Sequence, residues 1–346
     1  MKSRNRSWAP GCVVASALVM TAGLAQAGEY KAPRTRYGAP DLQGIWTNTA
    51  LTFLQRPPIF KSLIATDQEA AMMQKGFQAL VGDLISDKPI DPNNGPPPVV
   101  KEAPNADFLE MDLHLARIGG KMVSSWIVDP PDGRLPFTDQ GRQAVKDAGK
   151  ETFDGPEGRP LTERCLTAIG SPEGPPMMNT GFNAHYQILQ TRDDVAIEVE
   201  MNHDVRIIRL KDRNHPPPTV RLWMGDSIGW WEGDTLVVET TNFEPRLFVA
   251  SLGGGFAYSP QAKLTERFTR TGPDQILYEF SVDDPVMFKS VWRAQMPWRR
   301  AKGPIYEYAC HEGNYGVALA LSGAREQEKA AAAKAEAARS ALGEKP

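Results

Sequence analysis

The stretch KLTERFTRTGPDQILYEFSV, residues 263–282, contains two runs of alternating side chains separated by a turn signal. Apolar and polar residues alternate in KLTERFTR (263–270), and QILYEFSV (275–282) continues the pattern with β-branched and aromatic residues. Successive side chains of a strand point to opposite faces, so a period of two is typical of a strand with one buried face. Between the runs, TGPD (271–274) favours a turn. The stretch therefore predicts two neighbouring antiparallel strands.

Most of the second half of the chain repeats this pattern. The runs follow one another at roughly 10–12-residue spacing, are rich in β-branched and aromatic residues, and have no long helices between them. This spacing predicts a mainly β fold, either an antiparallel barrel or an open β-sandwich. The ten predicted strands are AHYQILQT (184–191), VAIEVEM (195–201), VRIIRLK (205–211), TVRLWMG (219–225), DSIGWWEG (226–233), DTLVVETTNF (234–243), the two runs above, FKSVWRAQM (288–296) and PIYEYAC (304–310).

The first residues predict export. A basic start precedes the apolar stretch CVVASALVMTAGL (12–24), and AQA (25–27) supplies the small residues at which a signal peptide is cut. We therefore predict a signal peptide that is removed near Ala27, leaving a periplasmic or secreted protein. No other run approaches the roughly 20 apolar residues that cross a membrane, so we predict no membrane span.

The charge balance argues against one class of partner. The chain has 39 Lys and Arg and 42 Asp and Glu residues, a formal net charge of −3, and removal of the signal peptide makes it more acidic. A nucleic-acid-binding protein is expected to show a basic patch or stripe, and the sequence shows none. We therefore expect no nucleic-acid partner, and the sequence leaves the oligomeric state open.

The cysteines predict one disulfide. Cys12 lies in the signal peptide, so only Cys165 and Cys310 remain in the mature chain. In an oxidising compartment, two cysteines most simply pair with each other. We predict a Cys165–Cys310 disulfide that joins the end of the β region to its beginning.

Four regions follow from these patterns. They are the signal peptide (1–27), an irregular Pro-rich wrapping segment (28–160), the antiparallel β domain (161–320) and an Ala-rich, charged helical tail (321–346). The tail is polar on all sides, which is typical of a solvated helix rather than of core.

The wrapping segment has a few regular elements of its own. LQGIWTNT (42–49) predicts a short strand, and 65–81 and 139–149 predict helices. DPNNGPPPVVKEAPN (91–105) predicts a loop, and 124–138 predicts two short extended runs around a turn.

Two motifs carry a resemblance to a known family. WEGDTLVVETTNF (231–243) and YEYACHEGNYG (306–316) resemble a large family of exported bacterial proteins of unknown function, which implies no activity. More weakly, Gly44-x-Trp46 at the start of a strand is similar to the opening of lipocalin-like (calycin) barrels. That resemblance implies an up-and-down barrel for the predicted strands.

The stretch EVEMNHDVRII (198–208) is the main candidate for acid–base chemistry. His203 would act as base, Asp204 would orient it, and Arg206 would stabilise an oxyanion. The alternative is that Asn202, His203 and Asp204 form the tip of a hairpin, since Asn and Asp favour turns. A continuous strand would instead put Asp204 and Arg206 on one face and His203 on the other.

CHEGN (310–314) offers His311 as an auxiliary acid next to the predicted disulfide, or as part of a surface turn that Gly313 permits. Sequence signatures of other chemistries are missing. There is no H-E-x-x-H, no G-x-S-x-G and no Gly-rich phosphate loop followed by Lys and Ser or Thr. We therefore predict no metal and no cofactor.

Aromatic residues are the candidates for ligand contact. Trp223, Trp231, Trp292 and Tyr278 would line a pocket, although a barrel core would also bury such side chains. Trp230 and Trp231 are adjacent, so both cannot face the interior of one regular strand. One of the two is expected at a mouth, at an interface or in solvent.

These observations leave three hypotheses. The first is an exported barrel that binds a small apolar or aromatic molecule. The second is a cofactor-free lyase, isomerase or hydratase that uses His203, Asp204 and Arg206 on the same barrel. The third is a carbohydrate or surface interaction module that uses exposed tryptophans.

Overall fold

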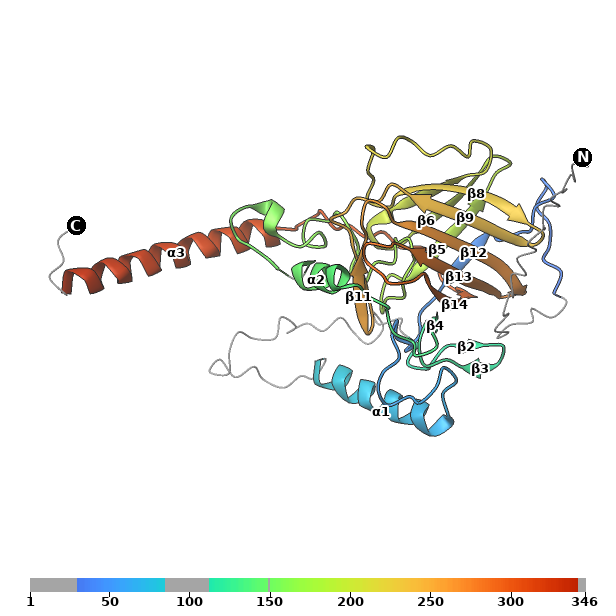
Figure 1. The fold of residues 1–346 in the computed structure, drawn as a ribbon, viewed down its shortest axis with the longest axis horizontal. Coiled ribbons are helices and arrows are strands. Elements are labelled where there is room, and N and C mark those ends of the chain that lie inside the picture. The colour runs from blue at the N-terminus through green and yellow to red at the C-terminus, as the bar shows by residue number, and fades with distance from the viewer. Residues whose placement is uncertain (1–29, 85–111, 149, 342–346) are drawn as a thin grey trace, which may run out of the picture.

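The computed structural model describes residues 30–84, 112–148 and 150–341, and its centre is a closed β-barrel (Figure 1). The predicted signal peptide (1–27) and loop (91–105) lie outside the described residues. The barrel wall has nine strands, and β1 closes it by pairing with both β5 and β14. In order around the wall these are β1 (Gly44–Thr47), β5 (His185–Gln190), β6 (Asp194–Val199), β7 (Val205–Arg209), β8 (Asp226–Glu232), β9 (Thr235–Thr241), β12 (Lys263–Gly272), β13 (Gln275–Asp283) and β14 (Trp292–Arg300).

The prediction of a mainly β barrel is thus confirmed, with one change in strand direction. Neighbouring strands of the wall are antiparallel except β7 and β8, which pair in parallel. A parallel neighbour cannot be reached by a tight hairpin, so the chain must return to the start of β8 through a long connection. That connection includes TVRLWMG (219–225), which was predicted as a strand and is instead irregular, with one isolated bridge from Leu222 to Phe243.

The predicted terminal strand PIYEYAC (304–310) is also wrong, because the segment is extended but unpaired. The reason lies in β14, whose neighbours are already β13, β1 and β4 (Ile127–Asp129). With β14 paired on both edges, the residues that follow it cannot add a strand to the sheet beside β14.

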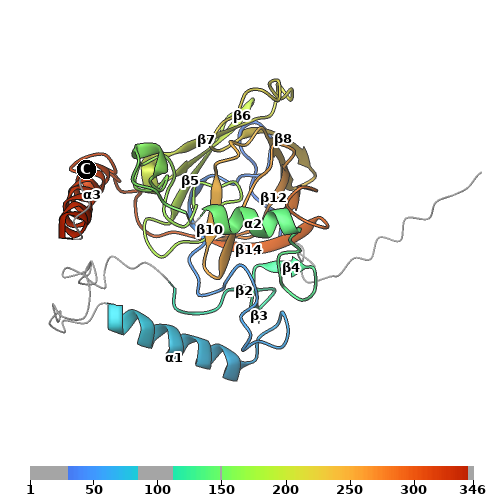
Figure 2. The same ribbon diagram turned by 60° about the vertical axis from the view of Figure 1, so that its left-hand side comes forward.

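Short elements surround the barrel (Figures 1 and 2). The hairpin of β2 (Arg117–Ile118) and β3 (Lys121–Met122) lies beside α1 (Asp67–Leu84), whose apolar side packs on a small cluster around Phe60. The hairpin of β10 (Phe248–Ser251) and β11 (Gly254–Ala257) contacts α2 (Asp139–Ala148). Single turns of 3-10 helix occur at η2 (Pro156–Gly158) and η3 (Met201–His203).

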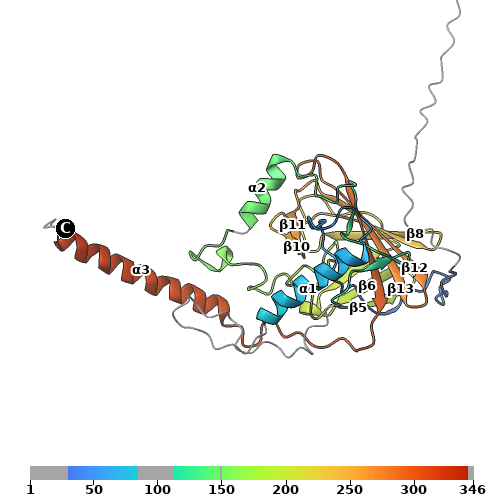
Figure 3. The same cartoon turned by 90° about the horizontal axis from the view of Figure 1, so that it is seen from below.

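Helices α1 and α2 lie close to their predicted positions, whereas α3 (Gly316–Ala341) begins before the predicted start of the tail at residue 321. Thr66 and Glu69 cap α1 reciprocally: the Glu69 N–H donates to Thr66 Oγ1 at 3.2 Å, and the Thr66 N–H donates to Glu69 Oε2 at 2.8 Å. The tail forms α3 (Gly316–Ala341), which projects away from the barrel (Figure 3). No helix in the described part of the chain is long and apolar enough to cross a membrane.

Large aromatic side chains fill the barrel interior. Trp298 stacks on Tyr186 with ring centroids 4.4 Å apart and meets Phe268 edge-on at 5.6 Å. Toward β10 and β11, Phe256 meets Trp292 at 5.2 Å. These side chains are fully buried, so the centre of the barrel is packed core rather than an open ligand cavity.

An irregular segment, SPEGPPMMNT (171–180), also packs into this core, and all ten of its residues are buried. We call it the plug segment. Its main chain is held by two core tyrosines: the Met177 N–H donates to the Tyr278 hydroxyl at 3.0 Å, and the Tyr258 hydroxyl donates to the Pro175 carbonyl at 3.0 Å. Buried polar backbone requires such partners, so the plug segment and the wall stabilise each other.

Candidate functional site

A cavity opens where β7 and β8 separate. Their parallel pairing covers only Ile208 with Ser227 and Arg209 with Ile228. Before these residues the strands diverge, and the first half of β7 faces residues 222–227 across the opening. We call this space the β7–β8 cavity.

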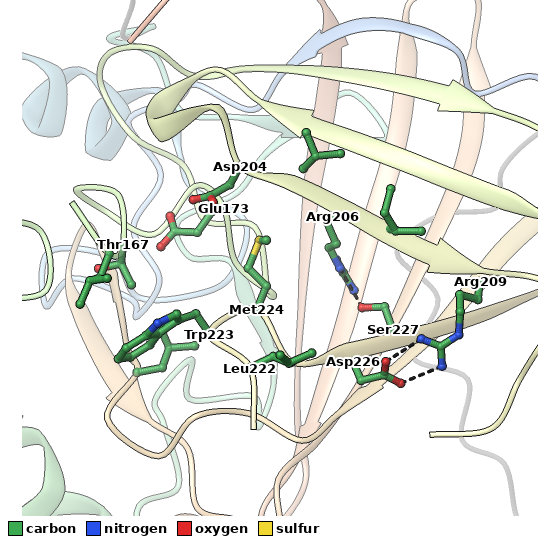
Figure 4. Close-up of a pocket in the computed structure, with 15 residues that line it drawn as sticks. Thr167, Glu173, Asp204, Arg206, Arg209, Leu222, Trp223, Met224, Asp226 and Ser227 are labelled. Carbon is green, nitrogen blue, oxygen red and sulfur yellow. Dashed lines mark hydrogen bonds and ion pairs between the residues drawn. The ribbon is translucent and has the colours of Figure 1, made fainter. Parts of the chain in front are cut away.

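The β7–β8 cavity has a volume of about 420 Å³ and combines an apolar lining with several charged groups (Figure 4). Four segments contribute: β7 with the residue before it, the start of β8 with the connection that precedes it, the stretch from Leu166 to Glu173, and Leu247 just before β10. The lining residues are Leu166, Thr167, Glu173, Asp204, Val205, Arg206, Ile207, Arg209, Leu222, Trp223, Met224, Gly225, Asp226, Ser227 and Leu247.

Arg206 points from β7 to a carboxylate in the barrel interior. Its guanidinium forms a two-pronged ion pair with Glu266, with one contact of 2.8 Å from Nη1 to Oε1. It also donates to the hydroxyls of Ser227 at 3.0 Å and Thr240 at 2.9 Å, while Tyr278 donates to Glu266 at 2.7 Å. The charge of Arg206 is therefore neutralised inside the wall, where it ties β7 to β8, β9 and β12.

Arg209 and Asp226 form a second pair at the other end of the cavity. Arg209 donates to both Asp226 oxygens, at 2.6 and 3.0 Å, and His215 Nδ1 lies 2.6 Å from Asp226 Oδ2. Burial would raise the pKa of Asp226, but the contacts with Arg209 and His215 outweigh burial and lower that pKa. This carboxylate is therefore held ionised by its neighbours.

Unlike Glu266 and Asp226, Glu173 is buried without a positively charged partner in the part of the chain that the structure describes. The residue is only 2% exposed; its Oε1 accepts the Ala168 N–H at 3.1 Å, whereas Oε2 has no hydrogen-bond partner among the described residues. Burial raises the pKa of Glu173 to about 8, and the charge of Asp204 adds to the effect. The carboxyl therefore titrates close to neutral pH on the wall of the cavity.

Asp204 is the second free carboxyl of the cavity. Its side chain lies beside Glu173 in Figure 4, and neither group forms an ion pair with a described Lys or Arg. Burial raises the pKa of Asp204, and the charge of His203 opposes that shift. Two carboxyl groups side by side repel each other when both are ionised.

The predicted acid–base trio is divided among three environments. Asn202, His203 and Asp204 do form the turn between β6 and β7. His203 turns away from the cavity, and its Nε2 accepts the Tyr308 N–H at 3.1 Å. Asp204 borders the cavity and Arg206 pairs with Glu266, so the structure does not place the three groups around one reacting atom.

A strap, residues 304–310, crosses this end of the barrel next to His203. Glu200 Oε1 accepts the Tyr306 N–H at 3.0 Å, and Oε2 lies 3.0 Å from His185 Nδ1. The predicted disulfide is confirmed: Cys165 and Cys310 are joined, with Cα atoms 5.9 Å apart. His311 follows in an exposed turn, where its carbonyl accepts the Asn314 N–H.

Only one of the four predicted ligand-contacting aromatics lines the β7–β8 cavity. Trp223 stands at its edge, with the Arg246 guanidinium 5.1 Å from the ring centroid. Trp231 is half-buried against the core, whereas Trp292 and Tyr278 are fully buried within it.

Glu173 is the residue that the sequence analysis missed. The sequence feature that could have identified Glu173 is that it is the one charged residue in the plug segment, SPEGPPMMNT (171–180). Glycine and proline there suggest an exposed turn, yet the segment is buried. A charged residue inside a buried segment is costly unless it is paired or used.

The chain matches no model of a known protein family and no curated protein. Fold and site together define a closed β-barrel with a filled centre and a lateral cavity that holds two unpaired carboxyl groups.

Proposed function

We propose that this protein binds a small apolar or aromatic molecule in the β7–β8 cavity. Trp223, Met224 and Leu247 provide an apolar lining, and the volume of about 420 Å³ falls within the range of about 300–1,000 Å³ typical of small-molecule sites. The centre of the barrel is not an alternative ligand site, because aromatic side chains and the plug segment fill it.

The observation that carries the proposal is the unpartnered Oε2 of Glu173. A buried polar atom without a hydrogen bond costs on the order of 1–3 kcal/mol. Such a group persists at the wall of a cavity when a bound molecule supplies the missing partner. The ligand is therefore expected to combine an apolar body with one polar group that reaches Glu173.

We further propose that the protein acts outside the cytoplasm. Support comes from the signal-peptide pattern before residue 28 and from the Cys165–Cys310 disulfide, since disulfides persist in oxidising compartments. The motifs WEGDTLVVETTNF (231–243) and YEYACHEGNYG (306–316) suggest the same location through their resemblance to exported bacterial proteins.

A second candidate function is cofactor-free proton transfer by a lyase, isomerase or hydratase. The observation that favours it is that Glu173 titrates near neutral pH, which suits a general acid or base. In this candidate Glu173 takes the part first assigned to His203, because His203 contacts the strap instead.

Native mass spectrometry of protein purified from its own cells tests the binding proposal. We expect a bound small molecule that is lost in Trp223→Leu, because Trp223 borders the cavity, and retained in Trp230→Leu, a matched change on β8 outside the lining. Equal retention by both variants, or failure of purified protein to bind any apolar or aromatic compound, would refute it. Conversion of the released ligand by wild type but not by Glu173→Gln would favour the enzyme.

A further inference from the structure

The first half of β7 has a free edge. On one side, β6 pairs with β7 from Val205 to Arg209. On the other side, β8 pairs only with Ile208 and Arg209, so residues 205–207 have no strand partner there within the described chain. Val205 and Ile207 are also about half exposed, at 47% and 49%.

Part of the main chain of Val205 and Ile207 is free to pair on the cavity side of β7. The Val199 N–H donates to the Asp204 carbonyl at 2.8 Å, so the Asp204 carbonyl faces β6. Successive residues of a strand direct their N–H and C=O groups to alternate edges. Those of Val205 and Ile207 therefore face the opposite edge. The parallel pairing of Ile208 with Ser227 uses the Ile207 carbonyl, so a bound strand could pair with both main-chain groups of Val205 and with the Ile207 N–H.

The two free carboxyl groups mark one end of this edge. Asp204 immediately precedes β7, and Glu173 lies beside it with its buried Oε2 unpartnered (Figure 4). Arg206 and Arg209 are already paired with Glu266 and Asp226. A bound cation would thus supply the charge and the hydrogen bonds that Glu173 and Asp204 lack.

The cation is better explained as organic than as a metal ion. Metal sites in proteins take roughly four or more ligands, and within the described residues no three His, Cys, Asp or Glu side chains lie close enough to form such a group. An ammonium group has three N–H donors and can bridge two carboxyl groups.

The edge also fixes the direction and length of a bound chain. A peptide parallel to β7 would begin at Asp204, whereas an antiparallel one would bring its negatively charged end to the carboxyl pair. Three residues of edge at about 3.3 Å each give roughly 10 Å, after which the pairing of β7 with Ser227 of β8 begins. This length fits two or three residues.

We propose that the ligand of the β7–β8 cavity is a di- or tripeptide with a free amino terminus, which pairs in parallel with the edge of β7 and places its ammonium group between Glu173 and Asp204. The inference rests on the proposed function, because it names the ligand class of the same cavity. Leu222, Trp223 and Met224 would contact its apolar side chains.

Isothermal titration calorimetry of the intact protein with four probes tests this inference. The probes are Ala-Leu-Ala-amide, its N-acetylated form, phenethylamine as an amine without a peptide, and indole as an apolar ring without an amine. We expect the free tripeptide to bind, and acetylation to weaken binding by roughly tenfold or more, since it removes a charge-assisted contact. Phenethylamine should bind at least tenfold more weakly than the tripeptide, because it cannot use the β7 edge.

Protein variants locate the contact. Glu173→Gln should weaken binding of the free tripeptide and leave the affinity for the acetylated tripeptide unchanged. It should also abolish the proton release that accompanies binding of the free tripeptide near pH 7. Glu157→Gln, an exposed residue outside the cavity, should change neither.

The alternative outcomes separate the two proposals. Equal affinity for free and acetylated peptide would overturn the ammonium site, and equal affinity for phenethylamine and the tripeptide would overturn the strand pairing. Binding of indole without either peptide would overturn the inference while the proposed function stands. No binding of any probe, with no ligand co-purifying, would overturn both.

Discussion

Glu173 and Asp204 come from segments that are 31 residues apart in the chain, yet their carboxyl groups meet on one wall of the β7–β8 cavity (Figure 4). Burial is the main cause of the raised pKa of Glu173, and the Asp204 charge raises it further. The Asp204 charge therefore makes ionisation of Glu173 more difficult, and the protonation of Glu173 is linked to folding and to ligand binding.

The first prediction concerns stability against pH. The pKa of Glu173 rises from 4.5 in the unfolded chain to about 8 in the fold, so between these values the folded state holds a proton that the unfolded state has lost. The free energy of unfolding should therefore fall as pH rises through this window, by up to roughly 1.4 kcal/mol per pH unit. Glu173→Gln should remove this slope, as measured by urea unfolding at pH 5, 6, 7 and 8. An unchanged slope in the variant would show that Glu173 ionises normally.

The second prediction concerns the buried ion pair. Arg206→Ala leaves Glu266 buried and unpaired, which should cost about 3–5 kcal/mol of unfolding free energy. Arg267→Ala, next to Glu266 on β12, breaks only the exposed pair with Glu232 and should cost about 1 kcal/mol or less. Urea unfolding of the two variants gives the comparison. Similar losses would mean that the interior pair is not the main stabilising contact of Arg206.

The third prediction concerns the disulfide. Cys165 and Cys310 close a loop with a sequence separation of 145 residues, so the chain-entropy estimate of its stabilisation is about 5 kcal/mol. Cys165→Ser with Cys310→Ser should lower the free energy of unfolding toward this amount. Unreduced, denatured protein without its first 27 residues should show no free thiol. Two titratable thiols would contradict the pairing.

The fourth prediction concerns the strap at acid pH. Burial would raise the pKa of Glu200, but the hydrogen bonds with His185 and the Tyr306 N–H lower it below its usual value. Stability from this group is therefore present above the unfolded pKa and is lost as pH falls through the folded pKa. The protection factors of the amides of residues 304–310 against hydrogen exchange should fall on acidification, and Glu200→Gln should show low protection factors already at pH 7. A strap protected equally in both proteins would mean that other contacts hold it.

The sequence predicted the barrel because alternation is a local property of each strand. The pattern in residues 263–282 became β12 and β13, paired from Lys263 with Asp283 to Gly272 with Gln275. The sequence did not predict that β8 runs parallel to β7, or that residues 304–310 form no strand. These depend on which strand edges are still free once β1 joins β14, and that is a property of the closed sheet rather than of any segment.

The candidate site was less predictable for the same reason. His203 and Asp204 lie at a turn, as one hypothesis held, but only the fold shows that His203 meets Tyr308 while Asp204 meets Glu173. Nothing local in SPEGPPMMNT (171–180) distinguishes a buried plug from a surface loop. The difference arises from Tyr258, just after β11, and Tyr278 on β13, which bond its main chain from much later in the sequence.

Closure of the barrel through β1 and β14 has a consequence for biosynthesis. Trp46 on β1 pairs with Arg300 on β14, so the barrel cannot close until the chain has been synthesised as far as Arg300. Contacts between such distant residues form slowly, and unpaired strand edges remain available for aggregation meanwhile. A chain with this topology therefore cannot close its barrel while residues 292–300 are still to be made.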